Sequence, residues 1–157
     1  MALETSAEII VAADRSTAFA IVRDPQRLAR CIPGCTELRA IGPDRYTAVL
    51  TSRVAFMTVS FNVTVDVTRI ELPSRLEATI TGDAIGLSGR VVATATMEFV
   101  EISEYRTAIR YTTAVGLTGK LGSLGQPVLR ATSARLAREF GDHLKAEIDR
   151  GASEPIA

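Results

Sequence analysis

The stretch "MTVSFNVTVDV", Met57 to Val67, alternates apolar and polar residues without interruption. Valine or phenylalanine occupies every second position after Met57, and Thr, Ser, Asn and Asp occupy the positions between them. Because successive side chains of a strand point to opposite faces of a sheet, the pattern predicts a strand with one buried and one solvated face. Such two-sided strands are typical of antiparallel sheets.

The same period of two extends on both sides of this stretch, from Thr36 to Leu117. Turn signals interrupt it at Gly42-Pro43-Asp44, at Leu72-Pro73-Ser74 and along the glycine series Gly82, Gly86 and Gly89. An earlier strand is predicted over Glu4 to Val11. Every second residue is predicted to point inward. These residues are Tyr46, Ala48, Leu50, Ser52, Val54 and Phe56; every second residue from Val59 to Val67; Leu76, Ala78 and Ile80; and every second residue from Val91 to Phe99 and from Ile109 to Leu117.

Helices are predicted at two places. Asp14 and Asp24 are suitable N-caps for two short helices, the second from Pro25 to about Arg30, because Asp accepts from free backbone N–H groups and Pro suits the first helical position. After Gly125 the apolar residues recur every three or four positions, which predicts a long amphipathic helix ending near Gly151. Its apolar stripe is Leu129, Thr132, Leu136, Phe140, Leu144 and Ile148.

This order of elements predicts an α+β helix-grip fold. A curved antiparallel sheet of about seven strands wraps around the long C-terminal helix, and two short helices follow the first strand. With 157 residues the chain is long enough to bury its own core as one domain, predicted over residues 1–151 with a flexible tail at 152–157.

A curved sheet against a straight helix leaves a wedge that bulky side chains would have to fill. The predicted inward positions include small residues instead, the chain has no Trp, and aromatic residues make up only 5%. These small residues are Ala48, Ala78, Ala93 and Ala95. They favour a cavity for a small molecule, with close dry packing of sheet and helix as the alternative.

Composition excludes several classes of function. The 18 basic and 18 acidic residues balance, and no basic face is evident, which argues against a nucleic-acid partner. The N-terminus lacks the pattern of a signal peptide, so the expected location is cytoplasmic. No cofactor is expected.

The segment Cys31-Ile32-Pro33-Gly34-Cys35 has three possible interpretations: a metal clip, a redox pair or a turn. A structural zinc site needs four Cys or His ligands, but the chain has two Cys and one His. The familiar redox pair has two intervening residues rather than three. A turn with buried, free and inert thiols is therefore favoured, and no metal site is expected.

No catalytic constellation is evident either. The single histidine, His143, lies beside Asp142 near the end of the long helix, which suits a solvated helix end better than a general base. Tyr46 and Tyr111 are predicted to point inward, where each hydroxyl either donates to a ligand carbonyl or is satisfied within the protein. No pair of inward carboxylates appears, so no catalytic residue is assigned and an enzyme is not expected.

Three stretches resemble the CoxG family of carbon monoxide dehydrogenase subunits, in the START/polyketide-cyclase (SRPBCC) superfamily. They are "RDPQRLARCIPGCTEL" (23–38), "TGDAIGLSGRVVATATMEF" (81–99) and "GLTGKLGSLGQPV…REFGDHL" (116–144). The resemblance covers about Ser6 to Leu144, and the Cys-Ile-Pro-Gly-Cys segment is its most specific part. One departure is Ala55-Phe56-Met57-Thr58, where family members usually carry a Gly-Pro turn.

The resemblance implies a helix-grip fold with a lipophilic cavity. It also implies partners: a molybdenum-hydroxylase-type dehydrogenase, with a role in recruiting it to the membrane or in handling a quinone-like electron acceptor. A location peripheral to the inner face of the membrane fits that role. Many members also carry a C-terminal extension that this sequence lacks, so stable anchoring by its own tail is not expected.

The ligand expected on these grounds is an apolar, quinone-like molecule with one or two oxygen functions. The candidate binding residues are Cys31, Ile32, Pro33, Phe56, Phe61, Met97, Phe99, Tyr111, Leu121, Leu124, Leu129 and Phe140. Leu121 and Leu124 are predicted to be partly exposed and to share one mouth with Ile32 and Pro33; the alternative is that these leucines are tucked into the core. A cyclase- or hydrolase-type enzyme and a ligand-free interaction module remain the alternative functions.

Overall fold

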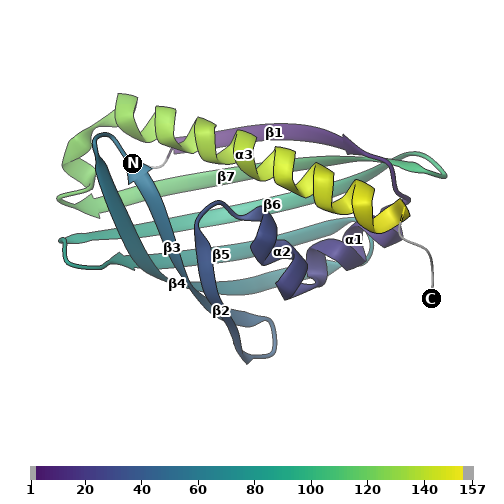
Figure 1. The fold of residues 1–157 in the computed structure, drawn as a ribbon, viewed down its shortest axis with the longest axis horizontal. Coiled ribbons are helices and arrows are strands. Elements are labelled where there is room, and N and C mark those ends of the chain that lie inside the picture. Colours follow the sequence, from purple (N-terminus) through teal and green to yellow (C-terminus); the bar gives the residue numbers. More distant parts are fainter. Residues whose placement is uncertain (1–2, 154–157) are drawn as a thin grey trace.

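The computed structural model describes residues 3–153, which form a curved seven-stranded antiparallel sheet and a long helix lying across its concave face (Figure 1). The strands are ordered β1-β7-β6-β5-β4-β3-β2 across the sheet. The helix-grip prediction is confirmed. The elements are β1 (Leu3–Val11), α1 (Arg15–Arg23), α2 (Pro25–Cys31), β2 (Cys35–Gly42), β3 (Arg45–Val54), β4 (Met57–Glu71), β5 (Arg75–Ala84), β6 (Gly89–Ser103), β7 (Arg106–Gly119), the 3₁₀ turn η1 (Gly122–Leu124) and α3 (Gln126–Ser153).

The register of the sheet confirms the predicted inward faces, with one exception. Residues predicted to share one face lie opposite one another across the strands, as in the pairs Val65–Ile80 and Ile80–Ala93. The exception is Phe56, which lies in the two-residue turn between β3 and β4 and is 85% exposed. The alternation of β3 suggested that the strand continued to Phe56, but the chain reverses at Ala55, whose φ is 56°.

The two short helices begin as the sequence predicts. Asp14 caps α1 by accepting from Thr17 N at 3.2 Å, and Asp24 caps α2 by accepting from Gln26 N at 3.0 Å. Pro25 occupies the first turn of α2, which extends to Cys31. Each cap satisfies a backbone donor that the helix itself leaves unpaired.

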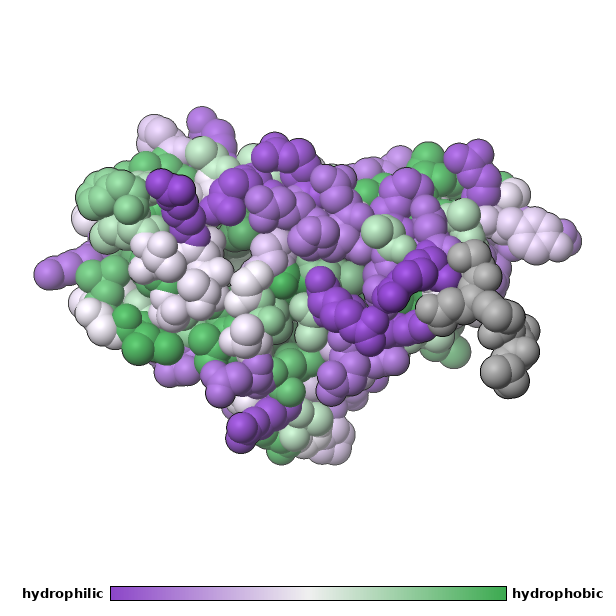
Figure 2. All heavy atoms as spheres, in the orientation of Figure 1, coloured by the Kyte–Doolittle hydropathy of each residue, from purple (hydrophilic) through white to green (hydrophobic). Residues whose placement is uncertain are grey.

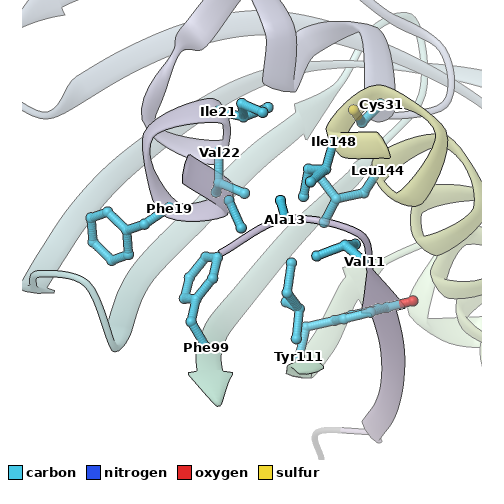
Figure 3. Close-up of a cluster of buried hydrophobic side chains, with 12 residues drawn as sticks. Val11, Ala13, Phe19, Ile21, Val22, Cys31, Phe99, Tyr111, Leu144 and Ile148 are labelled. Carbon is cyan, nitrogen blue, oxygen red and sulfur yellow. The ribbon is translucent and has the colours of Figure 1, made fainter. Parts of the chain in front are cut away.

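One apolar cluster fills the end of the molecule where α1 and α2 meet the C-terminal half of α3 (Figure 3). Phe19 of α1 packs against Phe99 of β6 with ring centroids 5.1 Å apart. Leu144 and Ile148 of α3 have no exposed surface in this cluster. We call it the helical cluster; its buried members are Val11, Ala13, Ala18, Phe19, Ile21, Val22, Cys31, Phe99, Ile109, Tyr111, Leu144 and Ile148.

A second apolar cluster lies on the strand ends near the start of α3. We call it the hairpin cluster; its buried members are Val54, Val59, Phe61, Val63 and Leu121. Leu121 is only 1% exposed, so the prediction that it is partly exposed is wrong. It is buried within this cluster and lies directly against Gly89 of β6, where a Cβ would be 2.6 Å from Leu121 Cδ1. Leu124 packs against the same cluster and is half-buried.

The two halves of α3 are held very differently. None of residues 126–140 is fully buried, and Leu136 and Phe140, which belong to the predicted apolar stripe, are half-buried. In the C-terminal half, by contrast, Gly141, Leu144, Glu147 and Ile148 are all buried. The helix is therefore packed tightly against the fold only along its C-terminal half.

α3 approaches the sheet closely at Gly141. Tyr111 Oη of β7 donates a hydrogen bond to the carbonyl of Ala137 at 2.8 Å, and the Tyr111 ring meets Phe140 edge-on at 5.4 Å. A Cβ at Gly141 would overlap Tyr111 Oη and lie 3.2 Å from Ile9 Cγ2. Glycine at this position lets the helix approach the hydroxyl closely.

α3 continues two residues beyond Gly151, to Ser153. A Cβ at Gly151 would lie 2.9 Å from Ile21 Cδ1 and 3.1 Å from Arg27 Nη1. The glycine permits close helix packing there instead of terminating the helix. Of the predicted flexible tail at 152–157, residues 152 and 153 are helical and residues 154–157 lie outside the described residues.

We expect Gly141→Ala to destabilise the protein by about 1–3 kcal/mol, because the added methyl must displace α3 from Tyr111. The same change at an exposed helical site would normally stabilise the helix. Chemical denaturation measures the difference. The double variant Gly141→Ala/Tyr111→Phe is the control: removing the hydroxyl should recover part of the loss. Unchanged stability of the single variant would contradict the close approach.

Candidate functional site

Two hollows open to solvent flank α3. The first has a volume of about 310 Å³ and lies between β1 and the middle of α3, with Ala7, Tyr111 and Gly141 among its lining residues. The second has a volume of about 420 Å³ and lies between the β3–β4 turn and the first turns of α3. Both volumes are within the range of small-molecule sites.

We call the second hollow the hairpin groove. Its seven lining residues are Arg53, Ala55, Pro127, Val128, Ala131, Thr132 and Arg135. Four of the seven are apolar, and Arg135 Nη2 crosses the groove to donate to the backbone carbonyl of Arg53 at 2.6 Å. Hydrophobic residues gather at the end of the molecule where α3 begins (Figure 2). The groove is therefore a mostly apolar surface between the β3–β4 turn and the start of α3, and the Arg135–Arg53 hydrogen bond joins these two elements.

Between the two clusters the concave face of the sheet is only half-buried. Tyr46, Ala78, Ala95 and Thr113 all point to this face and keep part of their surface exposed, and none is a member of either cluster. Three of these four side chains are small. The middle of the concave face thus carries small side chains of mixed exposure: Ala48 and Ala93, also outside both clusters, are buried, whereas these four are not.

One inward polar group has no partner. Among buried side-chain nitrogen and oxygen atoms of residues 3–153, Ser52 Oγ is the one without a hydrogen bond. Ser52 lies between the inward residues Leu50 and Val54 on β3, directly before Arg53 of the hairpin groove. The alternation of β3 predicts this serine on the inward face, but the sequence contains no sign that the hydroxyl is left unpaired.

Tyr111, in contrast, is committed to the fold. Its hydroxyl donates to Ala137 O, and burial together with the nearby Asp142 raises the pKa of the phenol. The sequence allows two interpretations of the Tyr111 hydroxyl: it donates to a ligand carbonyl, or it is hydrogen-bonded within the protein. The second is confirmed.

The candidate ligand-binding residues do not line one continuous wall. Cys31, Phe99 and Tyr111 belong to the helical cluster, with Met97 and Phe140 packed against it. Phe61, Leu121 and Leu124 belong to the hairpin cluster or pack against it. Leu129 is half-buried on α3, and Ile32 and Pro33 are half-buried in the turn after α2. Phe56 is exposed in its turn and does not line the interior.

The common mouth stays a prediction, although the two pairs of residues lie beside different parts of α3. The carbonyl of Cys31, next to Ile32, lies 3.3 Å from His143 Nδ1. His143 is eighteen residues beyond Gly125, about 27 Å along the helix axis at 1.5 Å per residue. Ile32 and Pro33 therefore border a different part of α3 from Leu121 and Leu124. The contact also gives His143 a structural role in joining α3 to α2.

The Cys31–Cys35 segment is a turn that ties α2 to the sheet. Gly34 has a φ of 73°, and a Cβ there would overlap the carbonyl oxygen of Thr51. Gly34 O in turn accepts from Thr51 N at 3.0 Å. Both cysteines are free, as predicted. Across residues 3–153 there is no group of three or more His, Cys, Asp or Glu side chains that could hold a metal.

Both thiols are held in the protonated, unreactive form. Burial, with a smaller contribution from Glu147, raises the pKa of Cys31 to about 11, and burial raises the pKa of Cys35. Glu147 is itself buried and lies 3.3 Å from Arg30 Nη1. A thiol reacts through its thiolate, so neither cysteine is set up as a nucleophile.

The fold and the partly filled concave face define the class: a helix-grip protein of the START/polyketide-cyclase type. The chain belongs to the CoxG family of carbon monoxide dehydrogenase subunits, whose model matches residues 8–149. Comparison with curated proteins gives no match. No helix within residues 3–153 is long and apolar enough to cross a membrane.

Three solved structures illustrate the similarity of fold. A conserved protein from Geobacillus kaustophilus is 26% identical, with a TM-score of 0.85 over 94% of this chain and 96% of that one. The Zhui aromatase/cyclase from Streptomyces sp. R1128 is 13% identical, with a TM-score of 0.72 over 96% and 95%. A START superfamily protein from Mycobacterium smegmatis is 12% identical, with a TM-score of 0.74 over 94% and 97%.

The last two similarities show the fold alone. Membership of a family of carbon monoxide dehydrogenase subunits supports an accessory role.

We expect Cys31 of the folded protein to resist iodoacetamide at pH 8. A pKa of about 11 leaves roughly a hundredfold less thiolate than the ordinary thiol has, and the side chain is 1% exposed. Cys35, which is half-buried, should react first. Peptide mass spectrometry over time measures both rates, with the urea-unfolded chain as control. Equal labelling of Cys31 in the folded and unfolded chain would contradict the assignment.

Proposed function

We propose that this chain is an accessory protein of a carbon monoxide dehydrogenase-like molybdenum hydroxylase system, and that it holds a lipophilic, quinone-like molecule. The observation that carries the proposal is the half-buried middle of the concave face, which carries small side chains beneath the loosely packed first half of α3. A guest bound there would cover apolar surface that the protein itself leaves partly exposed.

The chemistry of the inward residues supports a neutral guest. None of the inward residues in the central strands is Asp, Glu, Lys, Arg or His. The ranges concerned are 46–54 of β3, 59–67 of β4, 76–84 of β5, 91–99 of β6 and 109–117 of β7. A charged ligand would be buried among them without a partner, which is costly. The few inward hydroxyls, among them Ser52 and Thr113, suit one or two oxygen atoms on an otherwise apolar molecule. The same lack of charged inward groups supports binding rather than catalysis.

The dehydrogenase partner is proposed from the family. Exposed apolar side chains give it a physical basis: Phe56 is 85% and Ile85 is 51% exposed, in the β3–β4 and β5–β6 turns. The two turns are near each other, because Ile85 N donates to Ser60 O at 2.8 Å. An exposed apolar pair at one end of the domain suits contact with a partner enzyme or with a membrane surface during transfer of the ligand.

Ala95→Trp is the test of the binding site. Ala95 lies at mid-sheet on the concave face, opposite Ala78 on β5 and Thr113 on β7, so the indole can extend only toward α3. We expect at least a tenfold loss of affinity for decyl-ubiquinone, measured by isothermal titration calorimetry. Thr94→Trp is the matched control, because Thr94 is exposed on the opposite face of the same strand.

A thermal melt accompanies both variants. A folded Ala95→Trp protein that binds the quinone as wild type does would place the site elsewhere. An Ala95→Trp protein that fails to fold, beside a folded Thr94→Trp protein, would show that the interior has no room for a guest and would favour a ligand-free interaction module.

A further inference from the structure

We infer that the Ser52 hydroxyl is the hydrogen-bond donor that fixes the oxygen-bearing end of the guest, and that the guest reaches it through the hairpin groove. The inference rests on the proposed function, since it assumes a lipophilic ligand inside the fold. It adds a specificity-determining residue and a chemical class: a neutral apolar molecule with a carbonyl or ether oxygen at one end.

The first observation is the contrast between neighbouring hydroxyls. On the outer face of the same hairpin, Thr51 Oγ1 and Ser60 Oγ lie 2.9 Å apart and bond to each other. The fully buried Thr107 donates to the carbonyl of Ala13 at 2.8 Å, and Tyr111 donates to Ala137. Ser52 Oγ is closed off from water and has no such partner.

An unpaired buried hydroxyl is a cost to the fold, because it gives up its hydrogen bonds to water without replacement. The sequence could have avoided the cost with Ala or Val, since the inward neighbours Leu50 and Val54 are apolar. Sites at which a fold leaves such a cost uncompensated are expected to be functional. A ligand oxygen that accepts from Ser52 would compensate it.

The second observation is the route to this hydroxyl. Arg53, the next residue of β3, and Ala55 form one side of the hairpin groove, and the first turns of α3 form the other. No side chain of residues 126–136, which precede the Tyr111–Ala137 hydrogen bond, is fully buried, so moving these first turns loses less packing than moving the C-terminal half of α3. The Arg135–Arg53 hydrogen bond at 2.6 Å is the polar contact that spans the groove. Ser52 is next to Arg53 in β3 but does not line the groove, so a guest reaches its hydroxyl only when the first turns of α3 move away from the sheet.

Two arginines line the groove, so the preference for a neutral acceptor comes from the Ser52 hydroxyl and not from the groove itself. Arg135 donates to the carbonyl of Arg53 and also lies 3.7 Å from Glu139 Oε1. Arg53 is exposed and is in register with Thr58 on the outer face of the hairpin. The group that points inward at this place is the uncharged serine hydroxyl, which donates to a carbonyl or ether oxygen.

The test compares Ser52→Ala with Ser60→Ala, the matched loss of a hydroxyl from the outer face of the same hairpin. Two probes separate the polar contact from apolar binding: decyl-ubiquinone, which carries carbonyl and ether oxygens, and diphenylhexatriene, a hydrocarbon. We expect Ser52→Ala to weaken quinone binding roughly three- to tenfold, as the loss of one hydrogen bond implies, and to leave hydrocarbon binding unchanged. Ser60→Ala should change neither.

A thermal melt without ligand adds an independent readout. Ser52→Ala should melt at the same temperature as wild type or higher, because it removes an unpaired polar group. Ser60→Ala should melt slightly lower, because it leaves Thr51 without its partner.

Quinone binding that is equal in Ser52→Ala and wild type would overturn the inference and leave the proposed function standing. An equal loss of both probes, or a lower melting temperature for Ser52→Ala, would show that Ser52 is structural and would also overturn it. A wild-type protein that binds neither probe would overturn both. Tighter binding of decanoate than of decyl-ubiquinone would overturn the choice of a neutral ligand.

Discussion

One close contact sets how α3 lies on the sheet: Tyr111 Oη donates a hydrogen bond to Ala137 O, beside a glycine that leaves room for the hydroxyl. This contact fixes the height of α3 above the sheet near the middle of the helix. From there to its C-terminal end, α3 packs against α1, α2 and β1, and Leu144 and Ile148 are fully buried. Stability is thereby concentrated at the helical cluster, where side chains fill the space between helix and sheet.

The same constraint explains why the other half of the helix is loosely held. The sheet curves while α3 runs on from Tyr111 toward Gly125 (Figure 1). Ala78, Ala95 and Thr113 are small residues on the sheet in this region. The hairpin cluster closes the far end with Leu121, which precedes η1 and is not part of α3. The two apolar clusters therefore hold the two ends of the concave face, and the middle between them is less completely buried.

Much of this architecture could be predicted from the sequence. Alternation from Met57 to Val67 predicted the sheet, Asp14 and Asp24 predicted the starts of α1 and α2, and the period of the C-terminal segment predicted α3. The errors have physical causes. Phe56 continues an apolar alternation across a turn that lacks glycine, because Ala55 itself adopts the left-handed conformation.

The candidate site was harder to predict, because periodicity gives the face on which a residue lies but not what covers it. Phe61 and Phe99 both point inward, yet they belong to clusters at opposite ends of the concave face. Ser52 lies inward by the same alternation, but its importance lies in a missing partner, which only the packing around β3 reveals. A hydroxyl that the fold leaves unpaired, beside the half of α3 that the fold leaves loose, connects the weakest packing of the structure with its most specific chemistry.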